Sequence, residues 1–256
     1  MPNQPVPDVQ QKTVRSAIAP ILGDARISAP LTSQLLSGDV VTIMDGRGDW
    51  LQVRGPDAYE GWTHAGYLMP SSGSEDEWRI AIGCQVRDAV GMIRHLPLGA
   101  RIAPGIEVVS GLAIEADRRS HLFPSDGASI AQSAESLYAG ASYLWGGVTP
   151  WGCDCSGFVQ RIHWLHGCIL PRDAWQQAGL GREVSDEALN DHEPGDLMFF
   201  SDRDDSRVTH VGIALDGHRM VHSSLTRGGV AIEQLRSPDG YVTRLRGQCV
   251  GVRRLV

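Results

Sequence analysis

The apolar positions of residues 13–69 fall in short runs that glycine, aspartate and serine interrupt. The runs are Val14 to Leu22, Leu35-Leu36, Val40 to Met44, Trp50 to Val53 and Gly61 to Leu68. Runs of this length, separated by turn residues and without helical spacing, are typical of strands. We therefore predict a small β-barrel in this part of the chain.

A second group of apolar runs follows a polar segment. Residues 71–77 contain only serine, glycine, glutamate and aspartate, which is the composition of a linker. Strand-like runs then recur at 78–82, 93–102 and 106–109. They predict a second, more divergent barrel that ends near Phe123-Pro124.

The spacing then becomes helical. Apolar side chains recur with a helical period after Ser129, a residue type that caps helices, and again from Cys155 to Leu165, with Gly140 and Gly167 as stops. Residues 171–178 predict a short third helix with a proline at its first position. Strand patterns follow at 196–201, 209–215, 219–223, 230–235 and 249–256. Helices followed by a run of antiparallel strands predict an α+β domain.

Composition narrows the partners and the compartment. The chain has 256 residues, of which 42% are hydrophobic and 21% charged, as in ordinary globular proteins. The net charge of -7 argues against a nucleic-acid-binding surface, and no apolar run is long enough to span a bilayer. Because the first thirty residues lack a basic segment followed by an apolar core, we expect a cytoplasmic protein. Five cysteines are too sparse for a disulfide framework and fit reduced thiols: Cys84, Cys153, Cys155, Cys168 and Cys249.

The clearest chemical signal is a cysteine at the predicted start of a helix. Cys155 follows the loop-like residues 145–153, and in the first turn free backbone N–H groups and the helix dipole favour a thiolate. A nucleophile also needs a base, and His210 and His222 follow in strand-like runs. We therefore predict Cys155 as the nucleophile, His210 as the base and acid, and His222 as the group that orients the His210 imidazole.

The two histidine strands constrain the turn between them. To act together, His210 and His222 must lie on the same face of a sheet. Placing them directly opposite each other leaves residues 215–217 as a three-residue loop with glycine at its left-handed position. A two-residue turn at 216–217 would put them on opposite faces, so the functional interpretation favours the three-residue loop.

Two other roles would fit Cys155. A cysteine at a helix start can be purely structural, although two histidines following in strand-like runs disfavour this interpretation. A zinc site is the second alternative, because one segment contains Cys153, Cys155, His163, His166 and Cys168. Their spacing lacks the paired cysteine knuckle typical of structural zinc, so we expect no metal and no cofactor.

Five motifs in order carry a family resemblance. They are Tyr143-Leu144-Trp145-Gly146-Gly147, Asp154-Cys155-Ser156-Gly157-Phe158, Pro194-Gly195-Asp196-Leu197, Thr209-His210-Val211-Gly212-Ile213 and Val221-His222. They resemble the NlpC/P60 family of papain-like cysteine peptidases. Gly38-Asp39, Asp49-Trp50-Leu51-Gln52-Val53 and Gly61-Trp62 resemble a bacterial SH3-like (SH3b) domain. The resemblance implies an SH3b domain in residues 1–72, an SH3b-like domain in 73–125 and an NlpC/P60 peptidase domain in 126–256.

This combination resembles the γ-D-glutamyl-L-diamino-acid endopeptidases that act on cell-wall peptides. The resemblance implies a pocket for a free L-alanine amine followed by γ-D-glutamate, held partly by the residues flanking the cysteine, Asp154 and Ser156. It also implies a tyrosine from the first SH3b domain, which we match to Tyr59 with Tyr67 in reserve, and Tyr143 as a further oxyanion donor. A barrel closing one end of the cleft would admit only short murein peptides (L-Ala-γ-D-Glu-diamino acid), which suits cell-wall peptide recycling.

Other functions stay open at this point. An endopeptidase acting on intact peptidoglycan would use the same residues after export. A non-catalytic module would bind peptide through its SH3b domains. A permuted papain-like acylhydrolase is disfavoured, because there the histidine precedes the cysteine. Both diaminopimelate and lysine fit as the diamino acid.

Overall fold

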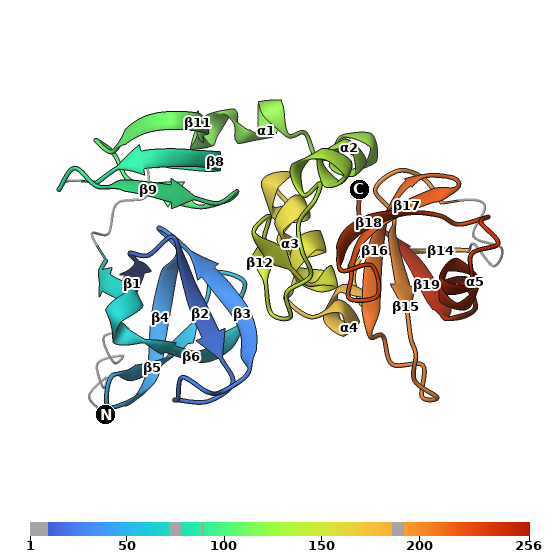
Figure 1. Ribbon diagram of the computed structural model, residues 1–256, viewed down its shortest axis with the longest axis horizontal. Coiled ribbons are helices and arrows are strands. Elements are labelled where there is room, and N and C mark those ends of the chain that lie inside the picture. The colour runs from blue at the N-terminus through green and yellow to red at the C-terminus, as the bar shows by residue number, and fades with distance from the viewer. Residues whose placement is uncertain (1–9, 72–77, 89, 186–191) are drawn as a thin grey trace, which may run out of the picture.

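The computed structural model describes residues 10–71, 78–88, 90–185 and 192–256. Nearly all of the predicted linker at 71–77 lies outside the described residues. Figure 1 shows a first sheet at lower left, a second sheet above it, and a larger domain of helices and strands beside both. The strands of these three parts span 11–70, 79–115 and 148–254, while the predicted domain boundaries at 72 and 125 stay predictions.

Residues 11–70 form one antiparallel sheet with the strand order β3-β2-β6-β5-β4-β1-β7. Its elements are β1 (Gln11–Val14), β2 (Ile18–Leu22), β3 (Leu31–Leu36), β4 (Val40–Arg47), β5 (Trp50–Arg54), β6 (Glu60–His64), a 3₁₀ turn (Ala65–Tyr67) and β7 (Leu68–Pro70). The predicted strands are present, although the first apolar run is divided between β1 and β2. Alternate side chains such as Val14, Ile21 and Val53 point inward and form a separate core.

The second sheet is built around one long strand. β8 (Arg79–Arg87) pairs with β11 (Glu107–Glu115) along one edge and with β9 (Ile93–Leu96) and β10 (Arg101–Ile102) along the other. Its core also takes in Leu36 from the first sheet and Val148 from the third part of the chain, so the three parts pack against one another. That these strands make an SH3-like barrel stays a prediction. A 3₁₀ turn (Ala116–Arg118) and α1 (Arg119–Leu122) lead out of it.

The third part packs helices on both faces of a sheet with the order β14-β19-β15-β16-β17-β18. Its elements are α2 (Gly127–Leu137), β12 (Val148–Thr149), β13 (Gly152–Cys153), α3 (Cys155–Leu165), α4 (Ala174–Gln177), β14 (Arg182–Val184), β15 (Leu197–Phe200), β16 (His210–Asp216), β17 (Arg219–Ser224), β18 (Gly229–Gln234), α5 (Gly240–Gly247) and β19 (Cys249–Arg254). α2 and α3 share a core with one face, and α5 packs on the other. The α+β prediction is confirmed, and papain-like packing stays a prediction.

Three helical predictions need correction. α2 is capped by Asp126, whose carboxylate accepts the backbone N–H of Ser129 at 2.9 Å and its hydroxyl at 2.7 Å, so Ser129 is not the cap. α4 begins only at Ala174, because Asp173 is extended and serves as the N-cap. α5 was missed because Val242 and Leu245 are its only buried residues, too few to give a visible apolar period.

The hairpin between β16 and β17 differs from the predicted register. Ala214 pairs with Met220, whereas Asp216 pairs with Arg219, so Leu215 forms a bulge. The turn therefore holds two residues, and the predicted three-residue loop is wrong. The carboxylate of Asp216 accepts the backbone N–H of Arg219 at 2.9 Å, which stabilises this tighter turn.

Because of the bulge, His210 and His222 still lie on the same face of the sheet. A two-residue turn alone would place His210 and His222 on opposite faces, but the extra residue shifts the register by one. The two residues are then displaced by two positions from direct opposition. Because the displacement is even, both side chains lie on the same face.

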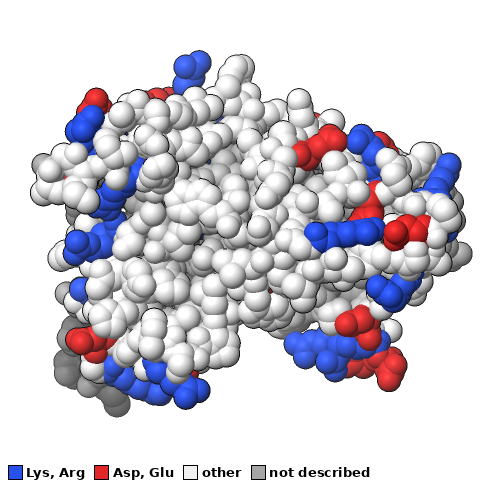
Figure 2. All heavy atoms as spheres, in the orientation of Figure 1, with Lys and Arg blue, Asp and Glu red and all other residues white. Residues whose placement is uncertain are grey.

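Charged side chains on the face seen in Figure 2 are scattered around the rim, with acidic and basic residues side by side. This face has no continuous basic area of the kind that binds nucleic acid. Within the described ranges, no helix is both long enough and apolar enough to cross a membrane.

The close approach of α3 to the preceding loop can be tested at Gly157. A Cβ at this position would overlap the backbone carbonyl oxygen of Gly147. We expect Gly157→Ala to lower the free energy of unfolding by about 1–3 kcal/mol. Gly240→Ala in α5 is the matched control, since a Cβ there meets no atom within 4 Å. Thermal unfolding measures both, and equal melting temperatures would contradict the close approach.

Candidate active site

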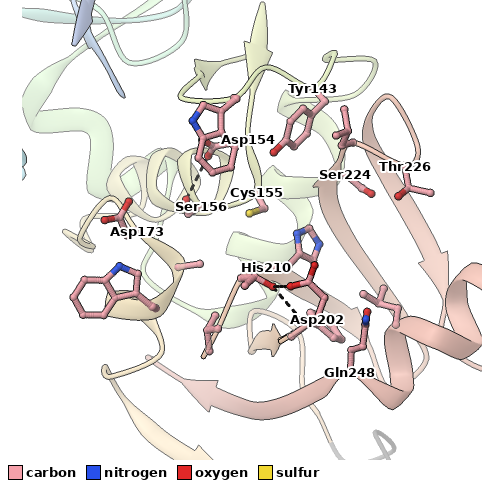
Figure 3. A pocket seen from close by; sticks show the side chains of 18 of the residues that line it. Tyr143, Asp154, Cys155, Ser156, Asp173, Asp202, His210, Ser224, Thr226 and Gln248 are labelled. Atoms are coloured by element: carbon pink, nitrogen blue, oxygen red, sulfur yellow. Dashed lines mark hydrogen bonds between the residues drawn. The ribbon is translucent and has the colours of Figure 1, made fainter. Parts of the chain in front are cut away.

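A cleft of about 580 Å³ is lined by residues of both the first and the third parts of the chain. Its walls include Cys155, His210 and Tyr143 from the third part, with Tyr59 and Thr32 from the first. Figure 3 shows Cys155 at the centre of this cleft, at the start of α3. All the site residues predicted from the sequence except His222 and the reserve Tyr67 line it.

Asp154 sets the start of α3 and the path of the loop before it. One carboxylate oxygen accepts the backbone N–H of Gly157 at 2.8 Å and caps the helix. The other accepts the backbone N–H of Gly146 at 2.8 Å. Gly146 has a φ of +77°, which favours glycine, and a Cβ there would press on Leu31 of the first sheet.

Arg172 completes the bonding of this carboxylate. Its guanidinium donates to both oxygens of Asp154, at 2.6 and 3.0 Å, to the Ser156 hydroxyl at 2.9 Å, and to the Ser33 hydroxyl of β3 at 3.1 Å. The arginine is only 2% exposed. The residues flanking the cysteine, both predicted to bind substrate, are therefore held by a buried arginine that also reaches the first sheet.

The histidine pair is formed as predicted. Nε2 of His210 lies 2.7 Å from Nδ1 of His222, with the rings nearly perpendicular at 73°. His222 is completely buried, whereas His210 faces the cleft. Figure 3 shows the sulfur of Cys155 beside the imidazole of His210. The structure thus places Cys155, His210 and His222 in one row.

Burial controls the protonation of this row. It raises the pKa of the Cys155 thiol to about 12, with a further contribution from the Asp154 carboxylate, although Arg172 and the backbone N–H groups of Val211 and Ser156 act the other way. Burial also lowers the pKa of His210 to about 3, and His222 adds to this shift. The expected preference for a thiolate is therefore wrong for the free protein, because desolvation outweighs the helix terminus. Thiol and imidazole are both neutral before substrate binds.

Two tyrosines border the cysteine. Tyr143 pairs with Cys153 through an isolated bridge, and Figure 3 shows its hydroxyl directed into the cleft. Burial, with the nearby Cys155 and Asp154, raises the pKa of Tyr143 to about 12, so its hydroxyl stays protonated and able to donate. Tyr59 lines the same cleft, whereas Tyr67 lines a different hollow beside Trp50.

The loop that carries Tyr59 is anchored on α3. One oxygen of Asp57 accepts the backbone N–H of Tyr59 at 3.1 Å, and the other accepts the side-chain amide of Gln160 at 2.9 Å. The pKa of Tyr59 is raised by burial and then by the charge of Asp173. Tyr59 and Asp173 therefore lie close enough to share a binding site.

Asp173 is a site residue that the sequence analysis missed. It lines the cleft, and among the described residues its carboxylate has no hydrogen bond or ion pair. The pattern of residues 171–178 assigned it to a helix interior. Only the later start of α4 leaves its side chain facing the cleft.

The residues of the zinc alternative have other contacts. His163 is buried and bonds through Nδ1 to the backbone carbonyl of Val159 at 2.9 Å, while His166 bonds to Pro124 and Ser133. Across the part of the chain that the structure describes, no group of three or more His, Cys, Asp or Glu residues could hold a metal ion.

Known proteins share both the sequence motifs and the fold. Residues 140–246 match the NlpC/P60 family and residues 24–69 match the bacterial SH3 domain. The chain is 27% identical over 255 residues to a γ-D-glutamyl-L-lysine dipeptidyl-peptidase of Bacillus cereus, covering 85% of this chain and 74% of that protein. It is 40% identical over 102 residues to the murein DD-endopeptidase MepS/murein LD-carboxypeptidase of Escherichia coli, covering 40% of this chain and 51% of that one.

The fold of nearly the whole chain is similar to the crystal structure of an NlpC/P60 family protein from Bacillus cereus. The TM-score is 0.78 at 20% identity, and the likeness covers 95% of this chain and 99% of the other. At this identity the likeness concerns the fold alone. The domain matches show that the chain carries an NlpC/P60 domain with a bacterial SH3 domain ahead of it.

Proposed function

We propose that this protein is a cysteine peptidase that hydrolyses the bond between γ-D-glutamate and a diamino acid in murein-derived peptides with a free N-terminal L-alanine. The observation that carries the proposal is that Cys155 and His210 line one cleft with Tyr59 of the SH3 domain, while the buried His222 contacts His210 from behind. The names of the Bacillus cereus and Escherichia coli relatives support a substrate derived from peptidoglycan.

The chemistry follows from the neutral thiol and imidazole. As the sulfur of Cys155 attacks the γ-carbonyl carbon, the imidazole of His210 takes the thiol proton. The carbonyl oxygen becomes an oxyanion that accepts hydrogen bonds from the backbone N–H of Cys155 and the Tyr143 hydroxyl. The C–N bond then breaks as the His210 imidazolium protonates the leaving amine. Water hydrolyses the thioester, again with His210 as base.

The contacts of the two aspartates separate their roles. Both oxygens of Asp154 are engaged by Arg172 and by backbone N–H groups, so its charge is compensated. Asp173 has no such partner among the described residues and faces the same cleft as Tyr59. Binding of the L-alanine ammonium by Asp154 and Ser156 stays a prediction, and these contacts favour Asp173 together with Tyr59.

The position of the SH3 domain favours short substrates. Three hydrogen bonds hold this domain against the cysteine helix and its loop. Their acceptors in the SH3 domain are Ser33, Gln34 and Asp57, and their donors are Arg172, Val148 and Gln160 respectively. Tyr59 is thereby held in the wall of the cleft, where it would limit the space for a long substrate. We propose a role in recycling released peptides in the cytoplasm, with cleavage of intact peptidoglycan as the alternative.

Removal of the sulfur tests the nucleophile. Cys155→Ala is expected to lower the rate of hydrolysis of L-Ala-γ-D-Glu-diaminopimelate by about a thousandfold or more, because the proposed mechanism needs the Cys155 sulfur to form the thioester. Cys168→Ala, at a partly exposed cysteine outside the cleft, is the control. Mass spectrometry of the released L-Ala-γ-D-Glu measures both, and activity retained by Cys155→Ala would overturn the mechanism.

Acetylation of the substrate tests the ammonium site. The wild type is expected to cleave the free-amine peptide and to ignore its N-acetylated form. Asp173→Asn should lower kcat/KM for the free-amine peptide by about ten- to hundredfold, because it removes a carboxylate that has no hydrogen bond or ion pair among the described residues. Equal rates on both peptides would show that no ammonium is bound. Purified sacculi serve as a third substrate, because only an enzyme that cleaves intact peptidoglycan would act on them, whereas a recycling enzyme would not.

Asp154→Asn is expected to behave differently from Asp173→Asn. It leaves the buried Arg172 guanidinium without its counter-charge, which should cost about 3 kcal/mol of folding free energy. Denaturant unfolding should therefore show a large decrease in the free energy of unfolding for Asp154→Asn and almost no decrease for Asp173→Asn. The same stability in both variants would contradict this division of roles.

A further inference from the structure

A buried carboxylate lies behind the histidine pair. In the β17–β18 ladder Ala231 pairs with His222, and Glu233 follows two residues later on the same face. Glu233 is only 4% exposed, and its Oε1 lies 3.4 Å from Nε2 of His222. The other ring nitrogen of His222 faces His210 at 2.7 Å. Nothing in the sequence motifs pointed to Glu233.

Arg227 holds this carboxylate in its ionised form. From the turn between β17 and β18 it donates to both oxygens of Glu233, at 2.7 and 2.9 Å. Burial alone would raise the pKa of Glu233, but hydrogen bonding with His222 and Arg227 outweighs it and lowers the pKa to about 2. Glu233 is therefore negative at any pH at which the protein works.

An ionised carboxylate dictates the tautomer of its neighbour. Oε1 can only accept a hydrogen bond, so a neutral His222 carries its hydrogen on Nε2 and has its lone pair on Nδ1. Nδ1 then accepts the hydrogen of His210 Nε2 across the 2.7 Å contact. A neutral His210 is left with its lone pair on Nδ1, the only ring nitrogen still able to take a proton from Cys155.

The distance of 3.4 Å is longer than an ordinary N–H···O bond, and Nε2 of His222 is otherwise without a partner. Such contacts in an active site commonly tighten when charge develops. As His210 takes the thiol proton, positive charge spreads towards His222, and the attraction of Glu233 for the Nε2 hydrogen grows.

We propose that Glu233 is a positioning residue that fixes the tautomers of His222 and His210 and stabilises the positive charge on the pair during catalysis. The proposal rests on the proposed hydrolysis by the Cys155 thiol. It adds Glu233 as a fourth member to the row of Cys155, His210 and His222. Arg227 serves it by holding the carboxylate in place, and also lies 4.7 Å over the ring of Tyr241 on α5.

Titratable groups face His222 from every neighbouring element. They are His210 on β16, Glu233 on β18 and Tyr241 on α5. Arg227, in the turn before β18, contacts Glu233, and Cys155 on α3 lies beside His210 (Figure 3). Only Glu233 and Arg227 carry a charge in the free protein. Oε1 of the carboxylate faces the imidazole at 3.4 Å, and the guanidinium donates to this oxygen and to Oε2.

Kinetics of two variants separate charge from structure. Glu233→Gln keeps the shape and an acceptor oxygen but removes the charge, whereas Arg227→Gln breaks the same ion pair and leaves the charge. Glu233→Gln should lower kcat by about ten- to hundredfold with KM changed less than about twofold, since the charge acts only as the imidazolium forms. In Arg227→Gln kcat should fall much less. In Glu135→Gln, which breaks a surface ion pair with Arg219, kcat should not change.

The pH profile supplies the second readout. A carboxylate stabilises the protonated imidazole, so its removal lowers the pKa of the histidine pair. The acid limb of kcat/KM, where His210 becomes protonated and unable to act as base, should therefore move to lower pH in Glu233→Gln and stay in place in Arg227→Gln. An unchanged kcat and profile in Glu233→Gln, or the same shift in both variants, would overturn the proposal.

Two-bond ¹H–¹⁵N spectra of the histidine rings in the wild type decide the tautomers without any substrate. We expect both His210 and His222 to carry hydrogen on Nε2 and a bare Nδ1 at neutral pH. Hydrogen on Nδ1 of His222 would refute the role of Glu233 even if the variants fail to fold. Because this readout needs no turnover, failure of the proposed peptidase activity is distinguishable from failure of this inference.

Discussion

The ion pair between Arg172 and Asp154 is the contact on which the site depends. Both side chains are nearly inaccessible to water, and the guanidinium reaches the carboxylate at 2.6 Å. Burying two charges is costly, and the cost is met only when every donor and acceptor finds a partner. Here Asp154 also caps α3 and binds Gly146, while Arg172 also binds Ser156 and Ser33. One pair therefore fixes the cysteine, its preceding loop and the SH3 domain together.

Desolvation then shapes the chemistry. The same burial that protects the ion pair raises the pKa of Cys155 and lowers that of His210, so neither residue is charged in the free protein. In the proposed mechanism, charge appears only when the thiol proton moves during attack on the substrate. A site of this kind gains most from groups that stabilise charge at that moment. Tyr143 is placed to do so on the oxyanion side and Glu233 on the histidine side.

The SH3 domain contributes residues to the cleft. Gln34 and Asp57 bond directly to Val148 and Gln160 of the NlpC/P60 domain, and Tyr59 contributes to the wall of the cleft. The loop carrying Tyr59 is held at one end by a turn within the barrel and at the other by α3. Residues of two domains therefore line one cleft, and the proposed selection of short peptides with a free amine would depend on both.

The sequence by itself determined the local elements and the chemical identity of the central residues. The start of α3 at Cys155, its end before Gly167, and the strands bearing His210 and His222 follow from apolar periods and capping residues, which act over a few positions. The tertiary structure decided the rest. Arg172, Asp173 and Glu233 belong to no local pattern, and their roles arise from contacts as distant as Ser33 with Arg172. The bulge at Leu215 and the neutral state of Cys155 likewise depend on sheet register and burial, which arise only when distant segments pack together.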